Sequence, residues 1–311
     1  LMSSGIKIFA PASVANVAVG FDALGFAIDK PGDEIIVRKA DWKGLRITKI
    51  TGAGGKLPLE TEKNTAGVAA LRLLEHLDSA DLGIDMEIHK KMPFGSGLGS
   101  SSASAVAGAM AINELLGRPL EKRDLLPFAL EGEALASGGY HADNVAPSLL
   151  GGMILVRSHD PVDVHRLHVP RGLFASVIYP HVEVLTKAAR EILKPEVPLK
   201  NAIKQTANMG AFIVGLFNSD FELISRALQG HLIEPQRAVL IPHFYAVKEA
   251  ALRAGALGCS ISGSGPSIFA LSANSLIAEQ VGEAMQRIYK NAKIESNLYL
   301  SGINQEGAVK C

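Results

Sequence analysis

A run of glycines and serines in the first third of the chain has the residue types and spacing of a phosphate-binding loop. It reads Pro93-Phe94-Gly95-Ser96-Gly97-Leu98-Gly99-Ser100-Ser101-Ser102 and leads into an alanine-rich stretch that predicts a helix. Alternating glycines let the backbone turn tightly and approach a ligand where a Cβ atom would clash. Serine hydroxyls at a helix start lie beside free N–H groups and the positive end of the helix dipole. The run predicts a phosphate cradle, with Ser101 or a neighbour available to magnesium.

Other chemistries that glycine-rich turns support do not fit this run. A Walker loop needs a lysine and then Ser or Thr after its last glycine, but Gly99 is followed only by serines. A dinucleotide fingerprint needs a glycine where Ser100 stands, and it should follow the first strand. The G-x-S-x-G elbow of serine hydrolases is absent. A flexible loop is the remaining alternative, and the helix that starts directly after the run favours phosphate binding.

A second glycine cluster, Ser262-Gly263-Ser264-Gly265-Pro266-Ser267, lies between two strand-like runs. By itself, this cluster is explained by a hairpin turn. Taken together with the first loop, it suggests two backbone walls that close on one ligand.

One acidic residue in the predicted helix Asp124–Ser137 falls on the apolar face of that helix. Leu126 and Leu130 mark this face and Glu133 continues it, whereas Glu131 points away. A buried carboxylate is costly unless it meets a cation or hydrogen-bond donors. The pattern alone therefore leaves open a cation ligand or a structurally paired glutamate.

The elements that must position these residues are short strands and helices that intermix without a strict βαβ rhythm, so the sequence predicts an α+β fold. Strands are predicted at Ile6–Ala10, Gly25–Asp29, Glu34–Lys39, Leu45–Ile50, Ile84–His89, Gly151–Val156, Phe174–Tyr179, Leu257–Ser262, Ser267–Leu271 and Lys293–Leu300. Helices are predicted from Asn64 to Leu77, from Ser100 to Gly117, over Asp124–Ser137, and near 200–217, 220–230, 243–255 and 275–290. Turns around Pro161 and Pro170 suggest two domains, 1–165 and 166–311.

The overall composition excludes several classes of protein. The 31 basic and 31 acidic residues give a formal net charge of zero, which offers no attraction to a nucleic acid or an anionic membrane. With 48% hydrophobic and 20% charged residues, a large core is possible and global disorder is excluded. Cys259 and Cys311 are too few for a disulfide framework or a zinc site. Prolines and Gly/Ser clusters interrupt the uncharged stretches Met92–Asn113 and Ala254–Ala278, so we expect a cytoplasmic protein without membrane helices.

Three ordered motifs carry a resemblance to a known family. They are Pro11-Ala12-Ser13-x-Ala15-Asn16-x-x-x-Gly20-Phe21-Asp22, Gly97-Leu98-Gly99-Ser100-Ser101 and Ser262-Gly263-Ser264-Gly265-Pro266. Over nearly its whole length the chain resembles the GHMP small-molecule kinases. Through Asn16–Asp22, His141–Pro147 and Ile233–Arg237 it is most similar to the members that act on L-homoserine.

The resemblance implies an N-terminal domain like domain 2 of ribosomal protein S5 and a ferredoxin-like C-terminal domain. It also implies ATP and Mg²⁺, a homodimer, and neither nucleic acid nor membrane as a partner. The implied reaction is direct in-line phosphorylation of the hydroxyl of L-homoserine to O-phospho-L-homoserine in threonine biosynthesis. Such transfer depends mainly on positioning and charge neutralisation, so it needs no strong base.

The resemblance also assigns residues to roles. ATP binding falls to Asn64, Pro93, Gly95, Ser96, Gly97, Leu98, Gly99, Ser100, Ser101 and Ser102, and magnesium binding to Ser101 and Glu133. Substrate binding falls to Asn16, Asp22, His141, Asp143, Thr186, Arg190, Arg237 and Gly263, and catalysis to Asp143 and Asn144. From the residues alone, capping and Asx turns also explain Asn16, Asp22, Asn64 and the segment from His141 to Asn144.

Two roles and three alternative functions stay open. Asp143 is suited either to accept the hydroxyl proton or to hold the substrate ammonium group. Arg190 and Arg237 offer guanidinium forks for a carboxylate, although most arginines are solvated surface residues. The alternatives are a GHMP kinase for mevalonate or a sugar, a nucleotide-binding sensor without activity and, more remotely, a serine hydrolase.

Overall fold

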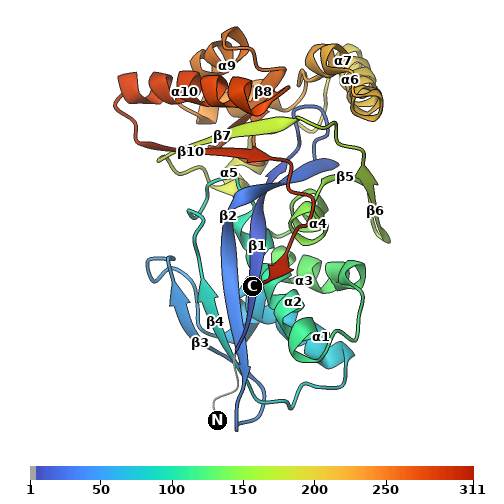
Figure 1. The fold of residues 1–311 in the computed structure, drawn as a ribbon, viewed down its shortest axis with the longest axis vertical. Helices are drawn as coiled ribbons and strands as arrows, with labels where there is room; N and C mark the ends of the chain where they lie inside the picture. The colour runs from blue at the N-terminus through green and yellow to red at the C-terminus, as the bar shows by residue number, and fades with distance from the viewer. Residues whose placement is uncertain (1–4) are drawn as a thin grey trace.

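The computed structural model describes residues 5–311, apart from the side chains of residues 136 and 137. Two β-sheets, each covered by helices, lie one above the other along the long axis of the molecule (Figure 1). This arrangement confirms the predicted α+β fold.

The N-terminal sheet has the strand order β11-β1-β2-β4-β3, and β5 and β6 extend it from β2. Only β3 and β4 pair in parallel among these described strands. Where the sequence predicts two strands, β2 is continuous, because both of its halves pair with β1 across a register shift between Pro11 and Ser13. The strands are β1 (Ile6–Ala15), β2 (Leu24–Lys39), β3 (Leu45–Thr51), β4 (Ile84–His89), β5 (Met153–His159), β6 (Val162–Leu167) and β11 (Val309–Lys310).

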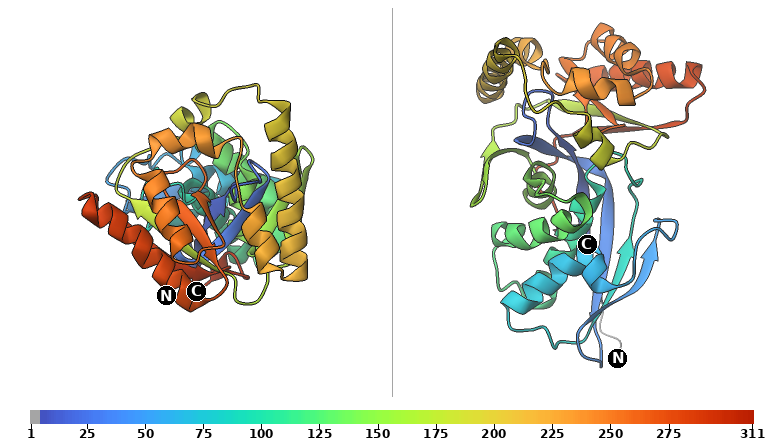
Figure 2. Two further views of the ribbon diagram at one scale, coloured as in Figure 1. Left: turned by 90° about the horizontal axis from the view of Figure 1, so that it is seen from above. Right: turned by 180° about the vertical axis from the view of Figure 1, so that it is seen from behind.

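Helices cover one face of this sheet (Figure 2). They are α1 (Thr65–His76), α2 (Ser100–Leu115), α3 (Leu126–Ser137) and α4 (Ala142–Leu150), with short 3₁₀ turns η1 (Thr61–Lys63) and η2 (Lys122–Leu125). The α2 helix is buried along most of its length and is rich in small residues. A Cβ atom on Gly108 would lie 2.4 Å from the carbonyl oxygen of Ala66, so α1 approaches α2 at a distance that only glycine permits. This close packing holds the start of α2 in place.

The C-terminal sheet is antiparallel, with the strand order β10-β7-β9-β8. Its strands are β7 (Phe174–Pro180), β8 (Gly258–Ile261), β9 (Ile268–Ser272) and β10 (Ser296–Gly302). Its helical elements are α5 (Thr186–Glu191), α6 (Leu199–Asn218), α7 (Phe221–Ala227), α8 (Glu234–Arg237), η3 (Ala238–Leu240), α9 (Phe244–Arg253) and α10 (Ser275–Asn291). Strand β11 pairs with β1, so the last residues of the chain return from the C-terminal sheet to the N-terminal one. The division into domains 1–165 and 166–311 therefore stays a prediction.

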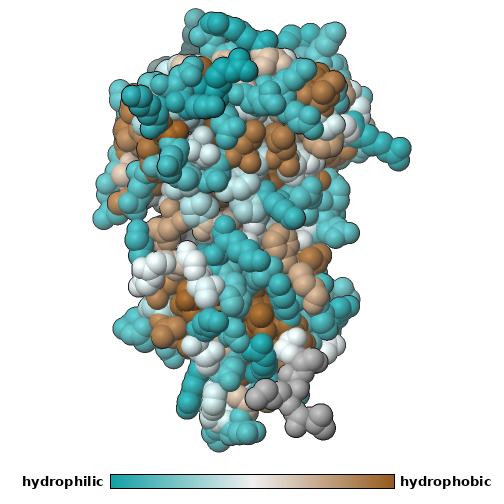
Figure 3. Space-filling model, turned by 60° about the vertical axis from the view of Figure 1, so that its left-hand side comes forward, coloured by the Kyte–Doolittle hydropathy of each residue, from teal (hydrophilic) through white to brown (hydrophobic). Residues whose placement is uncertain are grey.

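Hydrophilic side chains and scattered apolar patches share the side of the molecule drawn in Figure 3. Among residues 5–311, no helix is long and apolar enough to cross a membrane. The two uncharged stretches of the sequence instead supply the loop before α2 with most of that helix, and the strands β8 and β9.

Candidate functional site

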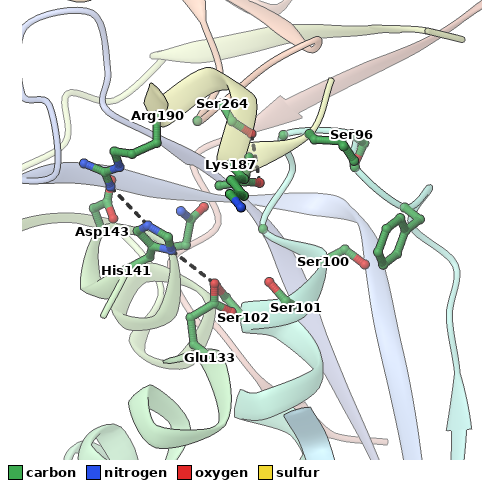
Figure 4. Close-up of a pocket in the computed structure, with 18 of the residues that line it drawn as sticks. Ser96, Ser100, Ser101, Ser102, Glu133, His141, Asp143, Lys187, Arg190 and Ser264 are labelled. Atoms are coloured by element: carbon green, nitrogen blue, oxygen red, sulfur yellow. Dashed lines mark hydrogen bonds and ion pairs between the residues drawn. The ribbon is translucent and has the colours of Figure 1, made fainter. Parts of the chain in front are cut away.

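The glycine-serine loop borders a cavity of about 330 Å³ (Figure 4). Residues from both the N-terminal and the C-terminal domain line this cavity. The cavity brings together most of the predicted site residues, although they come from distant parts of the chain. Those that line it are Asn16, Asp22, Gly95, Ser96, Gly97, Gly99, Ser100, Ser101, Ser102, Glu133, His141, Asp143, Asn144, Thr186, Arg190, Arg237 and Gly263.

The two glycine loops contact each other directly, as the sequence suggests. The Ser262 hydroxyl donates to the carbonyl oxygen of Gly97 at 2.7 Å, and the Ser267 N–H donates to the carbonyl oxygen of Ser96 at 3.2 Å. A Cβ atom on Gly97 would lie 2.6 Å from the carbonyl oxygen of Ser262, and the residue has a φ of 74°. Only glycine at this position lets the two walls close.

Serine hydroxyls and one buried carboxylate face each other at the start of α2. Glu133 on α3 is 3% exposed and Glu131 is exposed, as the helical pattern predicts. Glu131 forms an ion pair with Arg72 on the surface. Figure 4 shows the Glu133 carboxylate beside Ser102. The buried Ser102 hydroxyl has no hydrogen-bond partner among the described residues.

This donor set fits Mg²⁺. One carboxylate and serine hydroxyls are hard oxygen ligands, and Mg²⁺ completes such sites with substrate phosphates and water. Within the described part of the chain, no cluster of three His, Cys, Asp or Glu residues is placed to hold a metal. A cation here would therefore bind together with the phosphates that the cradle holds.

A buried ion pair contacts the start of α2, where the glycine-serine loop ends. The sequence did not predict this pair. Lys90, directly after β4, pairs with Asp33, whose side chain is fully buried. The Lys90 ammonium also donates to the carbonyl oxygen of Ser100 at 2.8 Å and to the Ser104 hydroxyl at 2.7 Å. The pair thus fixes the first turn of α2 against β2.

We expect Lys90→Met to lower the free energy of unfolding by about 3–5 kcal/mol, because it leaves the Asp33 carboxylate buried without its cation. Urea unfolding measures this loss. In the control Lys91→Met, the lysine side chain is 54% exposed and pairs with Glu34, and the expected loss is below about 1 kcal/mol. Equal losses in both variants would contradict the structural role of the buried pair.

Arginines and acidic residues gather at the opposite end of the cavity. The two terminal nitrogens of Arg190 donate to the Asp22 carboxylate at 2.7 and 3.2 Å. Arg237 is 3% exposed and donates to the carbonyl oxygens of Ala189 and Gly263 at 2.9 and 3.0 Å. Burial, and then the Arg190 charge, lower the pKa of Arg237 to about 10. Because Asp22 neutralises Arg190 while Arg237 donates to backbone carbonyl oxygens, Arg237 is the arginine of this pair that suits an anionic ligand group.

The aromatic ring of Phe21 contacts both Arg190 and Arg237. Its ring centroid lies 5.1 Å from the guanidinium carbon of Arg190 and 5.0 Å from that of Arg237. These are cation–π distances. A single aromatic side chain from the turn after β1 therefore orients two cations that come from the C-terminal domain.

The segment predicted as a polar turn is the first turn of α4. His141 lies 3.3 Å from the Glu133 carboxylate through Nδ1 and 3.2 Å from Arg190 through Nε2. Because arginine only donates, a neutral ring with its proton on Nδ1 satisfies both contacts. The Asn144 side-chain oxygen accepts from the Ser13 hydroxyl at 2.9 Å, which fixes this amide in the cavity wall.

Asp143 is a buried acid in the cavity wall. It is 2% exposed, and its Oδ1 has no hydrogen-bond partner among the described residues. Burial, and then the Asp22 charge, raise the pKa of Asp143 to about 7. A buried carboxylate in this state is suited to meet a cationic or hydroxyl group of a ligand.

We expect Asp143→Asn to stabilise the unliganded protein more at pH 7.5 than at pH 5. The pKa of Asp143 is about 7 in the folded state and about 3.9 in the unfolded state. Between these values only the folded state keeps the proton, so the free energy of unfolding falls as the pH rises through this window. The amide of the variant does not titrate and carries no such dependence. Melting temperatures from pH 4.5 to 8 test this, with the exposed Asp81→Asn as control, and parallel curves for wild type and Asp143→Asn would contradict it.

Three predicted ATP-binding residues lie outside the cavity lining. Asn64 caps α1 through its side-chain oxygen at 3.1 Å from the N–H of Ala66, Leu98 is fully buried, and Pro93 precedes the turn. Their predicted contact with ATP stays a prediction. The sequence reading missed these lining residues: Leu57, Thr65, Lys90, Phe94, Leu185, Lys187 and Ser264. Phe94 and Ser264 lie inside the two glycine-serine runs, which was the available signal, and Lys187 directly follows the predicted Thr186.

A glycine-serine loop at a helix start, in a cavity lined by two α+β domains that also holds a cluster of arginines and acids, fits a small-molecule kinase of the GHMP class. The family model for the GHMP kinases N terminal domain matches residues 64–152, and the model for GHMP kinases C terminal matches residues 212–291. The homoserine kinase of Chlorobium phaeovibrioides is 48% identical, covering 97% of this chain and 98% of that protein. The chain therefore belongs to the homoserine kinase family of the GHMP kinases.

Solved structures agree with this assignment. The crystal structure of homoserine kinase from Cytophaga hutchinsonii has a TM-score of 0.97 and 56% identity, covering 100% of this chain and 98% of that chain. A mevalonate kinase from L. major has a TM-score of 0.72 at 17% identity, covering 97% of this chain and 98% of that one. The second likeness supports the fold alone.

Proposed function

We propose that this protein transfers the γ-phosphoryl group of ATP to the hydroxyl of L-homoserine, giving O-phospho-L-homoserine and ADP in threonine biosynthesis. The observation that carries the proposal is a single cavity that both the serines at the start of α2 and two arginines beside acidic residues line. An amino acid substrate needs a cation for its carboxylate and an anion for its ammonium group, whereas a sugar needs neither.

Each group of cavity residues has its own role in the proposed reaction. The N–H groups and serines at the start of α2 bind the phosphates of ATP, and the terminal nitrogens of Arg237 bind the substrate carboxylate. Asp22 and Asp143 face the ammonium group, and Asn144 orients the hydroxyl for in-line attack. Glu133 and Ser101 would hold Mg²⁺, which would supply positive charge to the phosphates of ATP. Family resemblance supports the further proposals of a homodimer and a cytoplasmic location.

Among Lys90, Arg190 and Lys187, which all line the cavity, Lys187 has the weakest ion pair. Lys90 is neutralised by Asp33 and Arg190 by Asp22, whereas the Lys187 side chain is 85% exposed and lies 3.8 Å from the exposed Glu191. Figure 4 shows its amino group directed into the cavity, toward the serines of α2. An exposed pair holds a lysine weakly. Lys187 is therefore the residue on α5 that can stabilise charge on the transferred phosphoryl group.

We expect Lys187→Met to lower kcat about 100-fold while the KM for homoserine stays within about 3-fold, because the lost charge acts mainly in the transition state. Steady-state kinetics measure both constants. The matched control is Lys194→Met, an exposed lysine of the same segment outside the cavity. A rise in KM at constant kcat would instead place Lys187 in ground-state binding.

The experiment that tests the proposed function is a coupled ADP-release assay with ATP and Mg²⁺. The acceptors are L-homoserine, L-serine, mevalonate and galactose. Turnover with L-homoserine alone is the expected result. Turnover only with mevalonate or galactose would overturn the substrate assignment and keep the kinase. Binding of ATP without turnover of any acceptor would favour a sensor over an enzyme.

A further inference from the structure

The turn that follows β1 holds three consecutive residues in the left-handed backbone conformation. Asn16, Val17 and Ala18 have φ values of 70°, 41° and 59°, and none of them is a glycine. Residues with a Cβ atom rarely adopt this conformation, and a β-branched residue such as Val17 is the least suited to it. A strained backbone of this kind persists only where the surrounding structure holds it. The turn therefore depends on contacts from elsewhere in the fold.

Gln205, a buried residue of α6, makes such contacts through its side-chain amide. Its Nε2 atom donates to the carbonyl oxygens of Ala18 and Val19 at 3.2 and 2.9 Å. Its Oε1 atom accepts from the N–H of His231 at 2.8 Å. Only this orientation of the amide gives each of the three partners a hydrogen bond, since the nitrogen donates and the oxygen accepts. The amide thus joins α6 to the turn after β1, drawn in dark blue in Figure 1, and to the segment before α8.

The two segments that Gln205 joins lead to the arginines and acids of the cavity. The turn continues into Phe21 and Asp22, and Asp22 pairs with Arg190. The other segment leads into α8, whose last residue, Arg237, lies against the ring of Phe21. Gln205 itself does not line the cavity. Its amide therefore sets the position of these side chains from outside the cavity.

The same two segments also contact each other. A Cβ atom on Gly230 would lie 2.8 Å from the carbonyl oxygen of Ala18, so the segment before α8 packs directly on the turn. The Asn16 side-chain nitrogen donates to the carbonyl oxygen of Gly263 at 2.9 Å, and Arg237 donates to the same oxygen at 3.0 Å. A shift of the turn would therefore reach Arg237 through the acceptor that it shares with Asn16.

We infer that Gln205 is a positioning residue for substrate binding: it holds the left-handed turn in the conformation that presents Phe21 and Asp22 to Arg190 and Arg237. The inference rests on the proposed function, in which Asp22 and Arg237 bind the two charged ends of an amino acid. A residue that only stabilises the fold would change the free energy of unfolding and leave substrate affinity unchanged. A positioning residue changes the affinity for the substrate itself.

Steady-state kinetics of Gln205→Met test this role. Methionine has nearly the length of glutamine but donates no hydrogen bond, so the turn loses both contacts. We expect the KM for homoserine to rise about 10-fold, with kcat and the KM for ATP within about 3-fold, because displaced side chains weaken substrate binding. The matched control is Asn208→Leu on the same helix, which loses only a hydrogen bond to the carbonyl oxygen of Gln229. An unchanged KM for homoserine in Gln205→Met would overturn the inference, as would an equal rise in Asn208→Leu.

Hydrogen exchange tests the contact without a substrate. The N–H groups of Gly20 and Asp22 donate to the backbone and side-chain oxygens of Asn16 at 2.8 and 3.0 Å. In Gln205→Met, mass spectrometry is expected to show exchange at least about 10-fold faster over residues 16–24 and unchanged exchange in α10. Asn208→Leu is expected to exchange like the wild type over residues 16–24. Unchanged exchange of the turn in Gln205→Met would contradict the inference.

The two measurements separate this inference from the proposed function. A wild type that does not phosphorylate homoserine would contradict the proposed function, whereas hydrogen exchange would still decide whether Gln205 holds the turn. If Gln205→Met is not recovered as a folded protein, Gln205→Asn replaces it in both measurements. Asparagine is one methylene shorter, so its amide does not reach both carbonyl oxygens. The same changes are expected, with the KM for homoserine at least about 3-fold higher than in the wild type.

Discussion

Glu133→Gln is expected to lower kcat about 1,000-fold or more. The glutamine keeps the size of the side chain and a hydrogen-bonding oxygen beside His141, but it removes the buried negative charge that suits Mg²⁺. Losing charge neutralisation in the transition state of phosphoryl transfer costs this much in comparable sites. The measurement is kcat as a function of Mg²⁺ concentration, and the concentration for half-maximal rate is expected to rise as well.

The same helix supplies the control for this experiment. Glu131 lies two residues earlier, is about half exposed and pairs with Arg72 on the surface. Glu131→Gln is expected to keep kcat within about 2-fold, since exposed ion pairs contribute little. If Glu133→Gln retains wild-type kcat and the same Mg²⁺ dependence, Glu133 is a structural partner of His141 and not a metal ligand.

Arg237→Ala is expected to lower kcat/KM for L-homoserine about 1,000-fold, mostly through KM. A buried arginine that pairs with a ligand carboxylate contributes about 2–5 kcal/mol, of which 4 kcal/mol is a factor of about 1,000. The KM for ATP is expected to stay near its wild-type value, because the hydrogen bonds of Arg237 go to Ala189 and Gly263 and not to the serines of α2. The exposed Arg226→Ala on α7 serves as the control.

A substrate change separates binding from a structural role. The analogue is the amino alcohol in which the carboxylate of homoserine is reduced to a hydroxymethyl group. The wild type is expected to show a kcat/KM for this analogue that is lower than its kcat/KM for homoserine by nearly the factor that Arg237→Ala causes with homoserine. For Arg237→Ala, the kcat/KM is expected to be nearly the same with the analogue as with homoserine, because the variant already lacks the interaction with the substrate carboxylate. Independent, multiplying losses would show that Arg237 acts by holding Ala189 and Gly263 in place.

Local sequence was sufficient to place the glycine loop at the start of a helix and Glu133 on the buried face of another. Gly95, Gly97 and Gly99 all have positive φ, a conformation that favours glycine over other residues. The helical period placed Glu133 inside and Glu131 outside, and burial agrees. Local sequence did not identify the Lys90–Asp33 pair, because a lysine at a strand end is usually solvated and its partner is on another strand.

The sequence by itself determined the α+β class and, through its motifs, the family. Only the tertiary structure decided which residues meet. Arg190 and Arg237 have no local feature that distinguishes them from surface arginines, yet the fold brings both against Phe21. The fold also buries Asp143 beside Asp22, which raises its pKa to about 7. Glycine geometry and helical period are local properties that can be read along the chain, whereas burial and electrostatic coupling depend on neighbours that only long-range packing supplies.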